Sequence, residues 1–592
     1  MGAPDLSPVL EALAREGWRG FVLLRRHLAR NPRERRAVAR RLEDVPWERR
    51  SDLEARRVRF AFLSDALTAN FREPLLLECL ERGVIPVAYH APPGPLAREV
   101  GDPASGLWSC GADVIVVGQA APDPVPPGFL DRLLLDLDTV RGRSAATLLV
   151  HGFLAEEGAT AERREACARL GRDLAEGCRG VAGTRVVDLG AAAAASGARF
   201  WTLHKTRFLG GYAFPEEMAA ELCRGYAAAG AAARGLVRKC LVLDLDDTLW
   251  GGIVGEVGVA ALELGEGHPG SVYREVQRQA RRLRERGVVL AINSANDEED
   301  VWPALARPES LLGRHDFAAW RVNWEDKADN LRSLAEELGL SLDSLVVLDD
   351  DPVNREWIEE RLPEVHVLPA QDPLDMARAL ATTLLFEGLH LTAEDRGRAA
   401  AYAAARLRRE SEGASSDREA FLAGLGLRVT VGPAPPEHLP RLAQLSQRTN
   451  QFNLTARRYT QAELAGLCAD PDHAVLFCAC RDRFGDEGVT GLAVLRRREA
   501  EWSVDAFALS CRVLRWGVER TLAAVACRAA AERGGTSLLG EYVPTTRNRQ
   551  AEWFYRDLGF APVSVTAAGS TWRLALPAPA DMPAPWITLE GA

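Results

Sequence analysis

Several features are scarce or missing in this 592-residue chain, and each one narrows the choice of protein class. No apolar run approaches the roughly 20 residues that a membrane span needs, so we expect no membrane partner. The start lacks a basic stretch followed by an apolar core, so we expect no secretory signal. The 11 cysteines include no Cys-x-x-Cys pair, which argues against structural zinc and a disulfide framework. Reduced thiols are typical of the cytoplasm, where we expect the protein to work.

The composition is that of an ordinary globular protein, with 47% hydrophobic and 26% charged residues. A net charge of −10 over this length argues against a general nucleic-acid binder. At about 150 residues a domain, the chain has room for three or four domains. We place a helical N-terminal segment at 1–55 and three larger domains at 56–235, 236–395 and 396–592.

Residues 56–235 alternate between short apolar stretches and helical patterns. Helices are expected at 73–82 and 215–238, and strands at 58–65, 84–88, 112–117, 147–150 and 184–189. Strands that alternate with helices indicate a doubly wound α/β domain with a parallel sheet.

An apolar strand expected at 241–243 begins the central domain, and several aspartates follow it directly. If strand geometry persists, Asp244 and Asp246 share one side of the chain, because alternate residues of a strand face the same way. Two like charges repel each other, and burying them unpaired is costly. A divalent cation would relieve this repulsion, and Mg²⁺ is the usual one at a carboxylate site that handles phosphate.

A second strand of the same domain also ends in acidic residues. The wholly apolar run at 345–348 is followed by Asp349, Asp350 and Asp351. Folding gains nothing from crowding such charge unless a cation is close by. Since chemistry in open α/β sheets gathers at the carboxyl ends of strands, we expect the two acidic strand ends to meet.

Four strings of the central domain resemble the motifs of the haloacid-dehalogenase (HAD) phosphotransferases. The first is Asp244-x-Asp246-x-Thr248, and the second contains Ser294 after an expected strand at 288–292. The third is Lys327 at the start of an expected helix, and the fourth is the aspartate run after 345–348. The resemblance implies a Rossmannoid fold with Mg²⁺ held by Asp244, Asp246 and Asp349. It also implies contacts to the phosphorylated substrate from Thr248, Ser294, Lys327 and Asp350.

Roles in the reaction follow from the same resemblance. Asp244 attacks phosphorus and forms an aspartyl-phosphate. Asp246 serves as general acid for the leaving oxygen and then as general base. Ser294 and Lys327 stabilise the charge on the transferring phosphoryl group.

The longer string Asp244-Leu-Asp-Asp-Thr-Leu-Trp-Gly-Gly252 resembles the FkbH-like branch of this superfamily, and strings of the C-terminal domain extend the likeness over nearly the whole chain. Members of that branch make glyceryl thioesters on acyl carrier proteins. The resemblance implies a phosphorylated acyl donor such as 1,3-bisphosphoglycerate and a phosphopantetheinylated carrier protein in polyketide or related biosynthesis. Here Asn293 and Ala295 replace the usual Cys and Lys, which leaves the acyl group open.

The first α/β domain carries a Ser-Asp pair, Ser64 and Asp65, directly after its first expected strand. This pair resembles the nucleophile site of SGNH-type esterases. Ser64 could act only with a positioned base. The nearest late histidine, His204, does not have the spacing of that family, so a structural or docking role for the domain is the leading interpretation.

Residues 396–592 resemble a GNAT-type acyltransferase, an α+β fold. The expected strands at 474–479 and 488–495 form a hairpin, and a third at 502–509 leads into a helix start around Arg512. In GNAT proteins such a helix start binds the pyrophosphate of coenzyme A. Cys511 is our candidate for carrying the acyl group as a thioester, against the alternative of a small buried cysteine. Arg512 and Asn548 are the candidate substrate contacts of this domain.

Three hypotheses follow. The first is an FkbH-like phosphatase and acyltransferase that loads a carrier protein. The second is a Mg²⁺-dependent HAD phosphatase without acyl transfer, and the third is a binding protein of a biosynthetic assembly line without catalysis. The intact aspartates, Ser294 and Lys327 argue against the third.

Overall fold

The computed structural model divides the chain into two compact units, Met1–Arg396 and Gly397–Ala592. The division falls next to the boundary expected between residues 395 and 396. None of the described helices combines the length and apolarity that a membrane crossing requires. The residues that the structure describes are 24, 39, 42, 51–179, 181, 183–197, 208, 210–370, 372–387, 408, 417–449, 452–499, 501–510, 513–545, 548–566 and 569–590.

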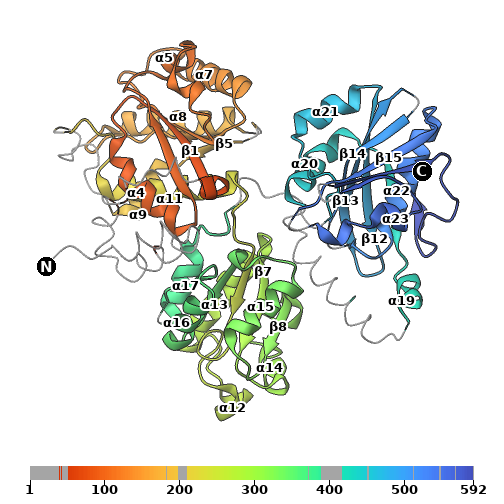
Figure 1. Ribbon diagram of the computed structural model, residues 1–592. Helices are drawn as coiled ribbons and strands as arrows, with labels where there is room; N and C mark the ends of the chain where they lie inside the picture. The colour runs from red at the N-terminus through yellow and green to blue at the C-terminus, as the bar shows by residue number, and fades with distance from the viewer. Residues whose placement is uncertain are drawn as a thin grey trace. The chain divides into compact units, whose positions relative to one another are not determined.

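The first sheet of unit 1 has five parallel strands in the order β2-β1-β3-β4-β5 (Figure 1). Its strands are β1 (Arg57–Ser64), β2 (Ile85–His90), β3 (Val114–Gly118), β4 (Thr147–His151) and β5 (Thr184–Val187). The helices are α4 (Arg72–Glu81), α5 (Leu96–Gly101), α6 (Gly106–Ser109), α7 (Phe129–Arg143), α8 (Ala161–Gly177), α9 (Leu189–Ser196) and α11 (Glu216–Ala233).

Side chains of β1 alternate between two cores, which explains the apolar character of the whole strand. Phe60 and Phe62 lie in the core formed with α4, α9 and α11. Ala61 and Leu63 lie in a second core, which α5 and α7 help to form. Helices therefore cover both faces of the sheet, as expected for a doubly wound domain.

The second sheet of unit 1 also has five parallel strands, in the order β10-β9-β6-β7-β8. Its strands are β6 (Cys240–Leu243), β7 (Val289–Ser294), β8 (Phe317–Val322), β9 (Leu345–Leu348) and β10 (His366–Val367). The helices are α12 (Val254–Val257), α13 (Gly270–Glu285), α14 (Glu298–Leu305), α15 (Lys327–Glu337), α16 (Pro352–Arg361) and α17 (Pro373–Thr382). The strands expected at 241–243 and 345–348 are confirmed as β6 and β9.

Unit 2 contains an eight-stranded sheet in the order β16-β17-β15-β14-β13-β12-β11-β18. Its strands are β11 (Arg428–Pro433), β12 (His473–Arg481), β13 (Asp486–Arg498), β14 (Glu501–Leu509), β15 (Ser537–Tyr542), β16 (Ala561–Thr566), β17 (Gly569–Ala575) and β18 (Thr588–Glu590). The helices are α19 (Arg418–Gly424), α20 (Leu439–Arg448), α21 (Gln461–Ala469), α22 (Val518–Glu532) and α23 (Phe554–Asp557). The expected hairpin is confirmed as β12 and β13, which pair antiparallel.

Candidate active site at the carboxyl edge of the second sheet

Three neighbouring strands of the second sheet end at one place. Asp244 follows β6, Ser294 is the last residue of β7, and Asp349 follows β9. β6 lies between β7 and β9, and all three run parallel. Because the carboxyl ends of parallel strands share one edge, side chains far apart in the sequence meet there.

The side chain of Lys327 connects two of the carboxylates at this edge. Its Nζ donates to Oδ2 of Asp244 at 2.6 Å and to Oδ2 of Asp349 at 2.6 Å. All three side chains are buried. Burial by itself would lower the pKa of Lys327, but the two carboxylates outweigh it and raise that pKa. The ammonium therefore stays charged and offsets part of the negative charge around it.

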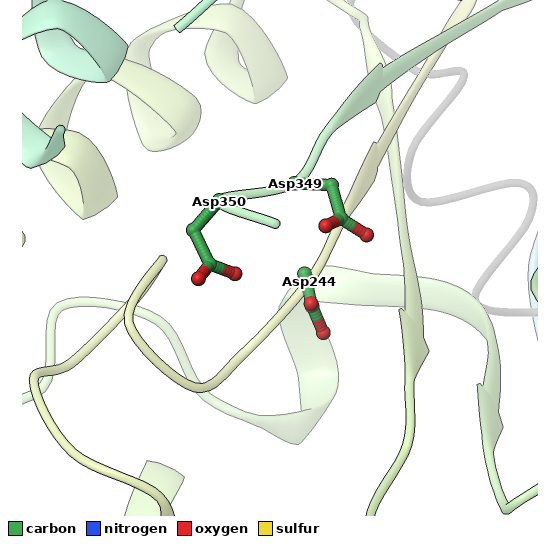
Figure 2. A group of neighbouring side chains, drawn as sticks. All are labelled: Asp244, Asp349 and Asp350. Carbon is green, nitrogen blue, oxygen red and sulfur yellow. The ribbon is translucent and has the colours of Figure 1, made fainter. Parts of the chain in front are cut away.

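The carboxylates of Asp244, Asp349 and Asp350 offer oxygen atoms within 4.8 Å of one another (Figure 2). Burial, and then the charge of Asp244, raise the pKa of Asp349, while Lys327 opposes the shift. Burial, followed by the charges of Asp244 and Asp349, raises the pKa of Asp350 to about 6. One ammonium does not offset three carboxylates. Carboxylate oxygens are the ligands that Mg²⁺ prefers, so this donor set fits the expected ion.

The carboxylate of Asp246 is held by three hydrogen bonds. It accepts from the indole of Trp250 at 2.8 Å, the backbone N–H of Val254 at 3.1 Å and the amide of Asn296 at 3.0 Å. Among the described residues, the carboxylate cluster that could hold a cation contains Asp350 and not Asp246. The metal-ligand role expected of Asp246 therefore stays a prediction.

Ser294 lies beside Asp244. Its Oγ donates to Oδ1 of Asp244 at 2.5 Å and accepts from the amide of Asn296 at 3.1 Å. Asn296 also donates to Asp246 and so links Ser294 to that carboxylate, a connection that no local sequence pattern predicts. Thr248 is fully buried, and among the described residues its hydroxyl has no hydrogen-bond partner.

Local sequence explains how Lys327 is held. Asp326 caps α15 by accepting from the backbone N–H groups of Ala328 at 2.8 Å and Asp329 at 3.1 Å. The amide of Asn293 donates to the backbone carbonyl of Lys327 at 3.0 Å. Asn293 stands where the FkbH-like pattern has a cysteine, and here it supports the position of Lys327.

The candidate residues of unit 2 have different outcomes. Cys511 and Arg512 lie outside the described residues. The helix that 510–517 was expected to open is confirmed as α22 (Val518–Glu532), which begins directly after Gly517. Asn548 is fully buried, and its amide donates to the backbone carbonyls of Asn453 and Val543. Asn548 was expected to contact substrate, but in this structure it ties two parts of the chain together.

Ser64 ends β1 at the carboxyl edge of the first sheet. Its Oγ accepts the backbone N–H of Ala66 at 3.2 Å. Close by, His151 at the end of β4 shares a 2.5 Å hydrogen bond with the hydroxyl of Tyr226. Among the described residues no hydrogen bond joins Ser64 to this histidine, and His204 lies outside them. Catalysis by Ser64 stays a prediction without a positioned base.

Comparison with known proteins adds to this geometry. No protein-family model and no curated protein matches the chain. The N-terminal part of BF1531 from Bacteroides fragilis, described as containing a phosphatase domain complexed with Mg, is 23% identical. That match has a TM-score of 0.51 and covers 56% of this chain and 95% of the other. This chain therefore shares the fold of a protein that contains a phosphatase domain.

Acetyltransferase structures match a smaller part of the chain. The ribosomal-protein-S18-alanine N-acetyltransferase from Escherichia coli is 16% identical, covering 25% of this chain and 93% of its own, with a TM-score of 0.20. A putative acetyltransferase from Salmonella typhimurium, solved with acetyl-CoA, is also 16% identical, covering 26% and 98%, again with a TM-score of 0.20. A TM-score this low does not establish the fold of unit 2, and its likeness to GNAT proteins stays a prediction.

Proposed function

We propose that the second sheet of unit 1 carries a Mg²⁺-dependent phosphotransferase site of the HAD type. The observation that carries the proposal is the position of Lys327 Nζ, 2.6 Å from both Asp244 and Asp349 with Asp350 alongside. Two buried carboxylates and a lysine, with a third carboxylate half-buried beside them, are costly for folding and useful for binding a cation and phosphate together. The fold shared with a protein whose phosphatase domain was crystallised with Mg supports the assignment.

Each residue of the site has its own role in the proposed reaction. A carboxylate oxygen of Asp244 attacks phosphorus, a new O–P bond forms, and the bond from phosphorus to the leaving oxygen breaks. Asp246 donates a proton to the leaving oxygen and later takes one from the water or acceptor that attacks the aspartyl-phosphate. Lys327 and Ser294 hold the phosphoryl oxygens. When bound by Asp244, Asp349 and Asp350, Mg²⁺ would neutralise charge on those oxygens.

The finer proposal is an FkbH-like transferase that takes a phosphorylated three-carbon acyl donor such as 1,3-bisphosphoglycerate. The Asp244 site removes the phosphate ester, and the acyl phosphate group supplies the acyl group for the phosphopantetheine thiol of a carrier protein. In this scheme the thiolate of Cys511 attacks the acyl carbon, and the bond from that carbon to the phosphate oxygen breaks. The deprotonated carrier thiol then attacks the new thioester, and Cys511 leaves as a thiolate. The strings that resemble FkbH-like proteins support this scheme.

A second candidate is a HAD phosphatase without acyl transfer. The engaged amide of Asn548 favours it, because that side chain is not available to a substrate in this structure. The two candidates differ in one product, the acylated carrier.

One experiment separates them. The full chain is incubated with Mg²⁺, acyl phosphates and holo carrier proteins, and both released phosphate and the carrier's mass are measured. The transferase predicts an acyl mass gain on the carrier that depends on Cys511, whereas the phosphatase predicts phosphate release with no gain. Asp244→Asn should stop the release of phosphate from the phosphate ester, and Asp329→Asn, an exposed aspartate on α15, is the matched control.

A further inference from the structure

The sheet of unit 2 opens between two of its central strands. β14 and β15 run parallel and pair at Glu501, Trp502 and Ser503, opposite Ser537, Leu538 and Leu539. Beyond Ser503 the two strands pair no further. Parted strands leave backbone N–H and C=O groups facing each other across a gap, and an extended ligand with amide groups could add there as a strand does.

The protein's own chain fills this gap. The backbone N–H of Leu509 in β14 donates to the carbonyl of Phe452 at 3.0 Å, and the N–H of Leu454 donates to Phe507 at 3.0 Å. On the other side, the N–H of Val543 after β15 donates to the carbonyl of Leu454 at 2.8 Å. The segment Phe452–Thr455 thus bonds to both sides of the opening and completes the ladder between them.

This segment is part of the core. Its four residues are all buried, with Leu454 at 0% exposure. The ring of Phe452 packs edge-on against Phe554 at 5.2 Å. The amide of Asn548 donates to the carbonyl of Asn453 at 2.9 Å and so holds the segment in place. A ligand could enter only by displacing this buried segment and breaking its backbone hydrogen bonds.

A pocket of about 260 Å³ lies at the start of α22, and its lining includes Phe452, Arg515, Glu519 and Arg520. Burial raises the pKa of the Glu519 carboxyl, while a backbone hydrogen bond and the charge of Arg520 oppose the shift. The N–H groups of a helix start commonly bind phosphate. Here the Glu519 carboxyl lies in the same pocket and adds negative charge beside the two arginines.

Coenzyme A, which the GNAT resemblance implies, therefore does not fit the described residues of unit 2. We propose that unit 2 is self-complemented: Phe452–Thr455 occupies the place of the extended part of such a ligand. Unit 2 then handles acyl groups without an acyl-CoA donor. This inference rests on the proposed acyl transfer, whose donor must then be an acyl phosphate, and the carrier must present its thiol without entering this gap.

Hydrogen exchange and ligand titration of the full chain test the proposal. Without ligand, the amides of Leu454, Leu509 and Val543 should exchange as slowly as those of β13. Acetyl-CoA should leave their exchange unchanged and bind with a Kd weaker than about 1 mM. Fast exchange of these three amides, or acetyl-CoA binding with a Kd below about 10 µM, would overturn the proposal.

Two variants sharpen the test. Glu519→Gln removes the charge at the start of α22 and should strengthen acetyl-CoA binding at most a few-fold, because Phe452–Thr455 still fills the gap. Glu552→Gln, an exposed carboxylate outside the pocket, is the matched control. A gain of 100-fold from Glu519→Gln would show that the segment is no barrier. Phosphate release that depends on Asp244, measured on the same samples, reports the proposed function separately.

Discussion

The two five-stranded sheets of unit 1 share one architecture and differ in what stands at the carboxyl ends of their strands. Both sheets are wholly parallel. At the edge of the first, polar groups are few and pair with one another, as His151 does with Tyr226 and Thr68 with His90. At the edge of the second, three carboxylates surround Lys327. The parallel sheet brings side chains at its strand ends together in both cases. Only in the second sheet does excess negative charge there suit the binding of a cation and phosphate.

The largest expected effect is the difference in phosphate release between variants at the two edges. Asp244→Asn should lower Mg²⁺-dependent phosphate release on the order of 10⁴-fold, because it removes the nucleophile. Ser64→Ala, at the corresponding strand end of the first sheet, should leave the rate within a factor of about two. Steady-state phosphate release from the phosphate ester of the donor measures both. Equal losses in the two variants would break the comparison.

The second-largest expected effect is on the free energy of unfolding. Lys327→Met leaves Asp244 and Asp349 buried without their counter-charge, so the free energy of unfolding without Mg²⁺ should fall by about 3–5 kcal/mol. Added Mg²⁺ should restore part of it. Arg332→Met removes the exposed pair with Asp329 and should cost less than about 1 kcal/mol. Urea unfolding with and without Mg²⁺ gives these values, and an Mg²⁺-independent loss would argue against a cation site.

The first edge has a pH dependence of its own. Burial lowers the pKa of His151 to about 4, below its ordinary value of 6.5. The unfolded chain therefore takes up the proton first as pH falls, and stability is lost between pH 6.5 and 4. The loss should reach about 3 kcal/mol. Burial lowers the pKa of His90 on β2 to about 4 as well. His151→Gln should therefore remove only its own share of the loss, about half of the total, whereas His315→Gln, an exposed histidine, should leave the profile unchanged. An unchanged profile in His151→Gln would show that another group titrates.

The smallest effect compares two helix caps. Asp326 caps α15 beside the second edge, and Asp188 caps α9 beside the first sheet by accepting from Ala191. Either change to Ala should cost about 1 kcal/mol of stability. Only Asp326→Ala should also slow phosphate release, because α15 carries Lys327. If both variants slow release equally, the effect comes from stability alone.

Much of the second sheet could be predicted because its strands are short apolar runs that end in aspartates, as β6 and β9 do. β8 was missed because Trp320 and Arg321 interrupt its apolar pattern. The direction of the Asp246 carboxylate depends on the turn after β6 and on Asn296. The role of Asn548 depends on Asn453, 95 positions away. Contacts of this range are set by packing and leave no local pattern in the sequence.

The most direct test of the central claim is the position of a bound ion. Crystals of the full chain soaked with Mn²⁺, which takes the same oxygen ligands as Mg²⁺, would show the ion by its anomalous scattering. We expect one peak coordinated by Asp244, Asp349 and Asp350, with the carboxylate of Asp246 still bonded to Trp250. A peak at another site, or full Mn²⁺-dependent phosphate release with no ion among these carboxylates, would contradict the account.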